Sequence, residues 1–187
     1  GAVNGVEIDH YGDRDLNIKP EFYVDGGFDG KGKALSFDGN RTILFPARVW
    51  PLSGFGSMSV YLKPETIGAK QSVIFKDGWY DGLHLNILAD GRAEIMRAYL
   101  QDLTKQNQLS FEYLTGKTKL KAGEWVKVEV RADAEKFQLY INDKLEATEK
   151  LGRFRSHGNG RVTLGGKKHI DYVPYRGLMD ELVLCGW

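Results

Sequence analysis

Six Asp-Gly pairs lie in the first half of the chain, and they restrict the fold more than any other feature of the sequence. The pairs are Asp25-Gly26, Asp29-Gly30, Asp38-Gly39, Asp77-Gly78, Asp81-Gly82 and Asp90-Gly91. Asp tolerates a left-handed backbone and Gly prefers it, so such pairs mark tight turns and hairpins. The chain must therefore reverse direction often, with short elements between the turns.

The segments between and after these turns alternate apolar and polar residues. Their apolar positions are Met58, Val60 and Leu62; Leu83, Leu85 and Ile87; Val126, Val128 and Val130; and Phe137, Leu139 and Ile141. A period of two places the apolar side chains on one face of a strand. Repeated at this spacing, and without a helical period of any length, the pattern predicts an all-β fold, a two-sheet antiparallel sandwich.

Length and charge limit the domain organisation and the partners. The 187 residues predict one domain, 1–187, in which weaker patterning over residues 1–20 indicates a lead-in segment. A net charge of +1 argues against a nucleic-acid-binding protein, because phosphate binding needs a clustered basic excess. No apolar run approaches the ~20 residues that cross a bilayer, so we expect no transmembrane segment.

The compartment can be inferred only indirectly. The start "GAVNGVEID" is typical of a mature or trimmed segment from which any signal peptide has been removed. The single cysteine, Cys185, excludes an intramolecular disulfide and a multi-thiolate zinc site, and its apolar strand predicts a buried thiol. The lack of disulfides favours bacterial export over a eukaryotic secretory origin. We therefore expect an extracytoplasmic protein (secreted, periplasmic or cell-surface) from a bacterium.

Several segments, in order, resemble a known family. "FDGKGKALSFDGN", "GSMSVYLKPET" and "SVIFKDG…GLHLNILADGRAEI" resemble the first half of a laminin-G-like jelly roll. "GEWVKVEVRADAEKFQLYINDKLEAT" resembles its Gly-x-Trp hairpin, and "VTLGG…YRGLMDELVLCGW" resembles its closing strands. The resemblance covers roughly residues 22–187 and is to the concanavalin A-like lectin/glucanase superfamily. It implies two curved antiparallel sheets packed face to face.

The resemblance leaves three functions open, because this fold carries several activities. The first is a non-catalytic carbohydrate-binding or adhesion module that acts on extracellular polysaccharide. The second is a glycoside hydrolase or polysaccharide lyase with a site on the concave sheet, using outward polar residues such as His84, Asn86 or Glu94. The third is a structural or protein-interaction domain. The Glu-x-Asp-x-Glu strand of the superfamily's glucanases is absent, which favours the first function.

Aromatic and basic residues provide candidates for ligand binding. Sugars stack on aromatic faces, and the candidate aromatic residues are Trp79, Tyr80, Tyr99, Tyr172 and Tyr175. The alternative is that half of these cover the ends of the core. His84 and Asn86 are also candidates, because parity turns them outward, although a solvated strand histidine is the alternative for His84.

The stretch 150–170 contains Lys and Arg residues, among them Arg153 and Arg155, but no Asp or Glu. Such a charge excess would attract an acidic glycan. A solvated loop face is the alternative interpretation of this stretch.

Two adjacent carboxylates, Asp180 and Glu181, interrupt an apolar run near the end of the sequence. Neighbours in a strand point to opposite faces, so they cannot form a catalytic pair around one glycosidic bond. Parity predicts that Asp180 shares a core face with Leu182 and Leu184, where an unpaired charge is costly. Its predicted partner is a backbone N–H of a neighbouring loop, and the alternative is a structural Ca²⁺ with Asp38 as co-ligand.

Overall fold

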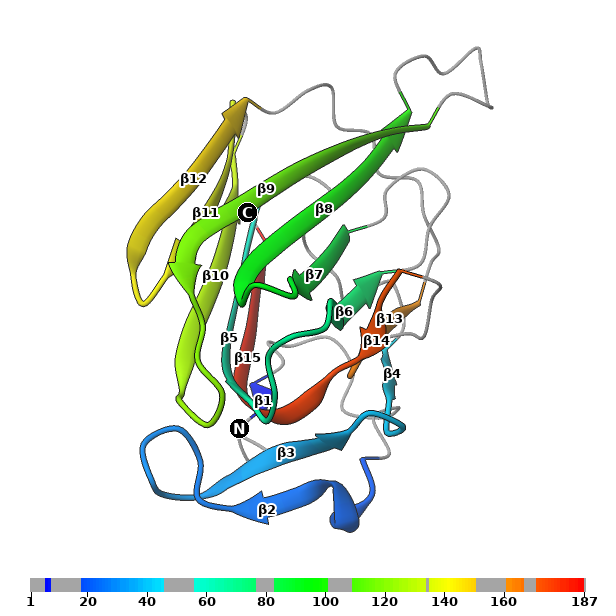
Figure 1. Ribbon diagram of the computed structural model, residues 1–187, viewed down its shortest axis with the longest axis vertical. Coiled ribbons are helices and arrows are strands. Elements are labelled where there is room, and N and C mark those ends of the chain that lie inside the picture. The colour runs from blue at the N-terminus through cyan, green and yellow to red at the C-terminus, as the bar shows by residue number, and fades with distance from the viewer. Residues whose placement is uncertain are drawn as a thin grey trace.

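The protein forms two β-sheets packed face to face, as Figure 1 shows. The computed structural model describes residues 6–7, 18–45, 56–76, 83–100, 109–133, 135–150, 161–166 and 171–186. In these residues the only helix is one turn of 3-10 helix, η1 (Pro20–Phe22), and none is long and apolar enough to cross a membrane. The predicted all-β sandwich is confirmed.

Each sheet has a continuous order of strands, with one further strand paired to it. Sheet A contains, in spatial order, β12 (Lys144–Lys150), β11 (Lys136–Ile141), β10 (Val126–Ala132), β5 (Gly56–Pro64), β15 (Arg176–Gly186), β3 (Lys33–Asp38) and β2 (Tyr23–Asp25), with β1 (Val6–Glu7) paired to β15. Sheet B contains β4 (Ile43–Phe45), β13 (Val162–Leu164), β6 (Gln71–Lys76), β7 (Leu83–Ile87), β8 (Arg92–Leu100) and β9 (Leu109–Lys119), with β14 (Val173–Pro174) paired to β6. In the described strands the pairing is antiparallel except at β1–β15 and β14–β6.

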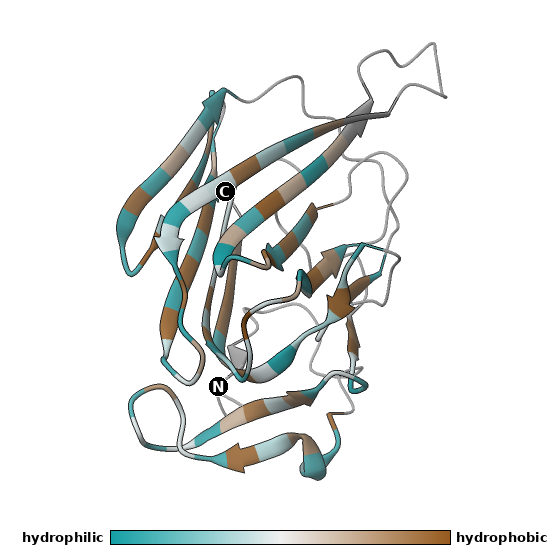
Figure 2. Cartoon of the chain, in the orientation of Figure 1, coloured by the Kyte–Doolittle hydropathy of each residue, from teal (hydrophilic) through white to brown (hydrophobic). Residues whose placement is uncertain are grey.

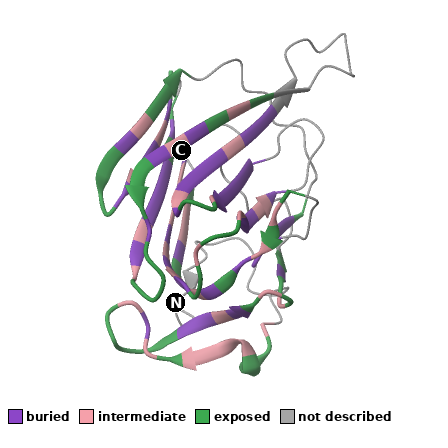
Figure 3. Cartoon of the chain, in the orientation of Figure 1, coloured by how far each residue is buried: buried purple, intermediate pink, exposed green. Residues whose placement is uncertain are grey.

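The core lies between the sheets and is built from the alternating positions that the sequence predicts. All twelve apolar residues named for the segments in β5, β7, β10 and β11 are at most 7% exposed. The alternation is visible as changing colour along β10 in Figure 2 and as purple segments along the inner strands in Figure 3. Burying each large apolar side chain stabilises the fold by about 1.5–3 kcal/mol.

The Asp-Gly turns also have the predicted backbone. Gly26, Gly30, Gly39 and Gly91 all have positive φ values, between 78° and 91°. The pairs at 77–78 and 81–82 lie outside the described residues. These left-handed glycines reverse the chain between strands, which is the role that the sequence predicts for them.

Cys185 departs from its prediction. It pairs with Ser57 of β5, and its neighbour Leu184 pairs with the core residue Met58. Because adjacent strand residues point to opposite faces, Cys185 lies on the face of sheet A turned away from the core, where it is exposed. The prediction of a buried thiol is therefore wrong.

Glu146 joins the edges of the two sheets. A register shift in the β11–β12 ladder pairs Tyr140 with Leu145 and Leu139 with Ala147, which leaves Glu146 as the extra residue of a bulge. Its buried carboxylate accepts the backbone N–H groups of two residues of β9, Lys117 (2.7 Å) and Thr118 (2.8 Å), and the Thr118 hydroxyl (2.9 Å). The contact satisfies backbone donors on an edge strand, where they would otherwise lack a partner.

This contact predicts an acid-dependent contribution to stability. Burial raises the pKa of Glu146, but the N–H groups of Thr118 and Lys117 outweigh it and hold the pKa below the ordinary value of 4.5. A lowered folded-state pKa gives stability that is present above the unfolded value and lost as the pH falls through the folded value. We expect Glu146→Gln to lower the free energy of unfolding at neutral pH by about 1–3 kcal/mol.

Urea unfolding of wild type and variant at neutral pH and well below pH 4.5 measures this contribution. The difference between the two proteins should narrow in acid. Glu149→Gln on the same strand is the control, because Glu149 is exposed. A Glu146→Gln difference of the same size at both pH values would contradict the assignment.

Candidate pocket on the outer face of sheet B

One row of side chains crosses sheet B on the face turned away from the core, the outer face of sheet B. Its members are paired strand to strand and are Leu44 (β4), Thr163 (β13), Phe75 (β6), His84 (β7), Met96 (β8) and Tyr113 (β9). Their neighbours along the strands, such as Ile74 and Ile95, are fully buried in the core. Since successive strand residues alternate between faces, the row points outward.

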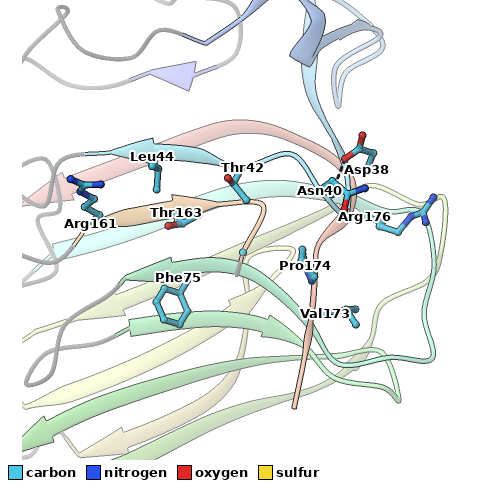
Figure 4. Close-up of a pocket in the computed structure, with 12 residues that line it drawn as sticks. Asp38, Asn40, Thr42, Leu44, Phe75, Arg161, Thr163, Val173, Pro174 and Arg176 are labelled. Carbon is cyan, nitrogen blue, oxygen red and sulfur yellow. Dashed lines mark hydrogen bonds between the residues drawn. The ribbon is translucent and has the colours of Figure 1, made fainter. Parts of the chain in front are cut away.

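A pocket of about 820 Å³ opens on this face, over β4, β13 and β6. Leu44, Thr163 and Phe75 of the row line it, and further lining residues come from the turn after β3 and from the segment that leads into β15. Figure 4 shows Arg161 at one end and Arg176 at the other, with the row residues between them. The volume lies within the ~300–1,000 Å³ typical of small-molecule sites.

Asp38 organises the turn at one end of the pocket. Its Oδ1 accepts the backbone N–H groups of Asn40 and Arg41, each at 2.9 Å, and its Oδ2 lies 3.4 Å from the Arg41 Nε. These N–H groups, with the Arg41 charge, hold the pKa of Asp38 below its ordinary value. The carboxylate is therefore ionised at neutral pH and fixes the β3–β4 turn, from which Asn40 and Thr42 reach the pocket.

The two arginines at the ends of the pocket differ in their partners. The backbone N–H of Arg176 donates to Gln71 Oε1 (3.0 Å), and its guanidinium lies 3.2 Å from Glu65 Oε1. Arg161 is exposed and forms no ion pair with any residue that the structure describes. The Arg161 end of the pocket therefore offers a cation to a ligand.

His84 and Asn86 face outward as predicted, yet they are buried, at 8% and 1% exposure. The Phe75 ring lies against the His84 ring, with centroids 4.1 Å apart, so a solvated strand histidine is the wrong description. Asn86 Nδ2 donates to Glu94 Oε1 (3.3 Å), which also lies 2.8 Å from Lys70 Nζ. These polar residues support the face of the sheet beside the pocket.

The carboxylates of this face are not arranged for hydrolysis in the part of the chain that is described. A two-carboxylate mechanism needs a pair ~5–9.5 Å apart across one cleft. Asp38 lines the pocket and Glu94 does not, and both are engaged by cationic partners. The described lining thus supplies one carboxylate, and that one is committed to a turn.

The structure contradicts Tyr175 as a ligand contact. Its side chain is fully buried, its hydroxyl donates to the Leu178 carbonyl (2.9 Å), and burial raises its pKa. This tyrosine belongs to the core, which is the alternative that the sequence left open. Tyr172 is half-buried and adjoins Val173, which lines the pocket.

The remaining candidate residues cannot be placed. Trp79, Tyr80, Arg153 and Arg155 lie outside the described residues, and so does the side chain of Tyr99, whose backbone belongs to β8.

The candidates predicted from the sequence do not include the apolar residues of the pocket floor or the outward residues of β9, which are Leu44, Phe75, Phe111 and Tyr113. Phe75 follows the core residue Ile74, and Phe111 and Tyr113 alternate with Glu112 and Leu114. Local alternation would not have identified these three aromatic residues as outward-facing, because Phe75 has the parity of the buried Val73. In β9 the polar Glu112, and not Phe111 or Tyr113, shares a face with the core residue Leu114.

A β-bulge decides where Asp180 points. Asp180 pairs with Tyr61 of β5, whereas the next pair is Val183 with Ser59, so β15 has one residue more than β5 between them. Asp180 therefore lies with Tyr61 on the face of sheet A turned away from the core. The prediction that it shares a face with Leu182 is wrong, because the extra residue reverses the alternation.

The predicted loop partner of Asp180 is confirmed. Its Oδ2 accepts the backbone N–H of Phe28 (3.0 Å) and its Oδ1 accepts that of Glu181 (2.8 Å). The Phe28 ring stacks on Tyr61 with centroids 3.9 Å apart, so the loop covers the carboxylate, which is 6% exposed. Asp180 thus anchors the β2–β3 loop on the outside of sheet A.

The register separates the two carboxylates predicted as calcium ligands. Asp38 pairs with Arg176 of β15. Arg176 lies four residues before Asp180 in the same strand, so the Cα atoms of Arg176 and Asp180 are roughly 13 Å apart. One Ca²⁺ binds its ligands at 2.3–2.6 Å, so these two residues do not meet at a single ion. Among the described residues, no group of three or more His, Cys, Asp or Glu could hold a metal. Calcium binding stays a prediction.

Comparison with known proteins gives one family and several similar structures. A laminin-G family model, described as concanavalin A-like lectin/glucanases superfamily, matches residues 37–185. No curated protein sequence is significantly similar to the chain.

Three of the similar solved structures are parts of carbohydrate-active proteins or carbohydrate-binding modules. Domain 4 of AbnA, a GH43 extracellular arabinanase from Geobacillus stearothermophilus in complex with arabinotriose, is 21% identical, with a TM-score of 0.66 over 98% of this chain and 80% of that one. The CBM40 of the Ruminococcus gnavus IT-sialidase is 18% identical, with a TM-score of 0.54 over 71% and 76%. CBM66 from Bacillus subtilis is 12% identical, with a TM-score of 0.51 over 88% and 91%. At these identities the likeness shows the fold.

Proposed function

The chain belongs to the concanavalin A-like lectin/glucanase superfamily, and we propose that it is a carbohydrate-binding module whose ligand occupies the pocket on the outer face of sheet B. Its similarity to the arabinotriose-bound domain and to two carbohydrate-binding modules supports this proposal. The arabinanase is extracellular, which favours an extracellular polysaccharide as the target.

The positions of the exposed apolar side chains support this proposal. Among the described residues, five large apolar side chains are exposed: Leu44, Phe111, Tyr113, Leu145 and Val173. Leu44 and Val173 line the pocket, and Phe111 and Tyr113 lie on the same outer face; Leu145 alone is elsewhere, opposite Tyr140 on sheet A. Exposed apolar surface gathered around a pocket with polar groups is typical of a binding site.

The pocket combines the two kinds of group that sugars need. Phe75 and Leu44 offer apolar surface to the C–H faces of a sugar ring, while Asn40, Thr42 and Thr163 offer amide and hydroxyl groups to its hydroxyls. The volume accommodates a short oligosaccharide.

Removing the ring in the pocket should weaken glycan binding. We expect Phe75→Ala to raise the Kd by roughly thirtyfold, which corresponds to the ~2 kcal/mol of a buried aromatic anchor. Isothermal titration calorimetry with arabinotriose, and with oligosaccharides selected by a glycan-array screen, measures the loss. Leu145→Ala is the matched control, because it removes exposed apolar surface on the other sheet. Equal effects of the two changes, at unchanged melting temperature, would contradict the proposal.

The same screen addresses charge and turnover. Arg161 would favour acidic over neutral glycans at low salt, because exposed charges are screened beyond ~10 Å at 0.1 M ionic strength. Uronate polymers therefore belong in the array beside neutral ones.

Reducing-end release monitored in parallel would reveal a hydrolase, and unsaturated products would reveal a lyase.

A further inference from the structure

The edge strand of sheet B presents two aromatic rings to solvent. Phe111 and Tyr113 are 50% and 52% exposed and lie on the outer face, opposite Ala98 and Met96 of β8. Glu112 between them points to the other face and pairs with the buried Arg97. Two large aromatic side chains held exposed on one face of a strand contribute little to the core, so their position indicates a contact with another molecule.

These rings are continuous with the pocket. The row Phe75–His84–Met96–Tyr113 crosses three strand spacings, or about 14 Å. Between the ends of the row lie the His84 ring, which packs against Phe75 and is 8% exposed, and the half-buried Met96.

No unpaired charge interrupts this surface in the described residues. The neighbouring pair in β7 and β8 is Asn86 with Glu94, and the Glu94 carboxylate is bound by Asn86 and Lys70. A neutral sugar chain could therefore lie across the strands without displacing a buried ion pair, which would be costly.

We infer that one glycan chain extends from the pocket across β7 and β8 to a stacking platform formed by Phe111 and Tyr113. This inference rests on the proposed carbohydrate binding and makes the target an internal stretch of a polysaccharide. Tyr113 ends the row, so a chain that crosses the strands reaches it first, and Phe111 lies two residues, about 7 Å, from it along β9 and widens the apolar surface there. Contact at both ends links two weak sites through one ligand, which raises affinity for long chains.

The test measures how glycan affinity depends on the length of the ligand and on which part of the outer face is altered. Wild type, Phe75→Ala, Phe111→Ala/Tyr113→Ala and Leu145→Ala are titrated with arabinotriose and an arabino-octaose; if the array selects another backbone, its trimer and octamer are used. We expect the wild type to bind the octamer about tenfold more tightly than the trimer. The Phe111→Ala/Tyr113→Ala variant should lose that gain while binding the trimer within about twofold of wild type. Phe75→Ala should weaken both ligands.

Different results would contradict the extended-chain inference and the proposed carbohydrate binding. Equal affinity of wild type for trimer and octamer, or equal loss of both in the Phe111→Ala/Tyr113→Ala variant, overturns the inference while leaving pocket binding intact. Absence of binding to every glycan overturns the proposed function itself. Analytical ultracentrifugation of the same proteins tests whether a second copy of the chain binds the two rings instead. If the wild type is a dimer, the Phe111→Ala/Tyr113→Ala variant is a monomer and both bind the octamer equally well, the rings serve self-association and the inference is wrong. Single Tyr113→Ala, checked by its melting temperature, replaces the double variant if that unfolds.

Discussion

Asp180→Ala should lower the free energy of unfolding by about 3 kcal/mol, or roughly 10 °C in melting temperature for a chain of this size. The substitution removes the acceptor of two backbone N–H groups, Phe28 N and Glu181 N, beneath a loop that excludes water. A buried donor without an acceptor costs about 1–3 kcal/mol. Gly27 shows how closely the loop approaches, because a Cβ there would lie 2.5 Å from Asp180 Oδ2. Thermal and urea unfolding measure the loss.

Two controls accompany this change. Asp180→Asn keeps the shape and one acceptor oxygen, so it should destabilise less than Asp180→Ala. Glu181→Ala removes an exposed carboxylate and should have a small effect. Equal, negligible losses for Asp180→Ala and Glu181→Ala would refute the anchoring role. Melts with EDTA test calcium: a chelator effect present in wild type and absent in Asp180→Ala would assign an ion to this carboxylate.

Gly166→Ala should be still more disruptive, costing about 4 kcal/mol or more. Gly166 has a φ of +72°, and a Cβ at this position would lie 1.8 Å from the Ser72 carbonyl oxygen of β6. Backbone atoms cannot move aside as a flexible side chain can, so the segment after β13 must separate from β6. Because Gly166 also lines the pocket, glycan affinity should fall with stability. Urea unfolding and calorimetric titration measure the two effects.

Gly30→Ala separates the two causes of this loss. Gly30 has a similar φ of +78°, but a Cβ there would have no atom within 4 Å. It should therefore show only the left-handed backbone cost of about 1–2 kcal/mol. Losses of the same size in both variants would mean that the close approach of Gly166 to Ser72 does not determine stability.

The sequence alone predicts strands β5, β7, β10 and β11 with their inward faces, and it predicts the Asp-Gly turns. Alternation in "SMSVYLKP" predicts that Met58, Val60 and Leu62 are buried, and all three are fully buried. This succeeds because alternation is a local property: successive side chains in any extended strand point to opposite faces. The left-handed turn glycines are predictable for the same reason, since φ depends on the residue and its immediate neighbours.

Tertiary structure alone decided which outward residues meet. Leu44, Thr163 and Phe75 become neighbours because β4, β13 and β6 pair across long stretches of chain, and no local pattern encodes that pairing. The bulge in β15 likewise depends on register against β5, and a single extra residue moved Asp180 from the predicted core face to the opposite one. The loop-like stretch around Tyr175 predicts a surface ring, and only the packing of distant segments makes this side chain fully buried. Alternation within a strand follows from local sterics, whereas register, bulges and the pocket follow from contacts between distant segments.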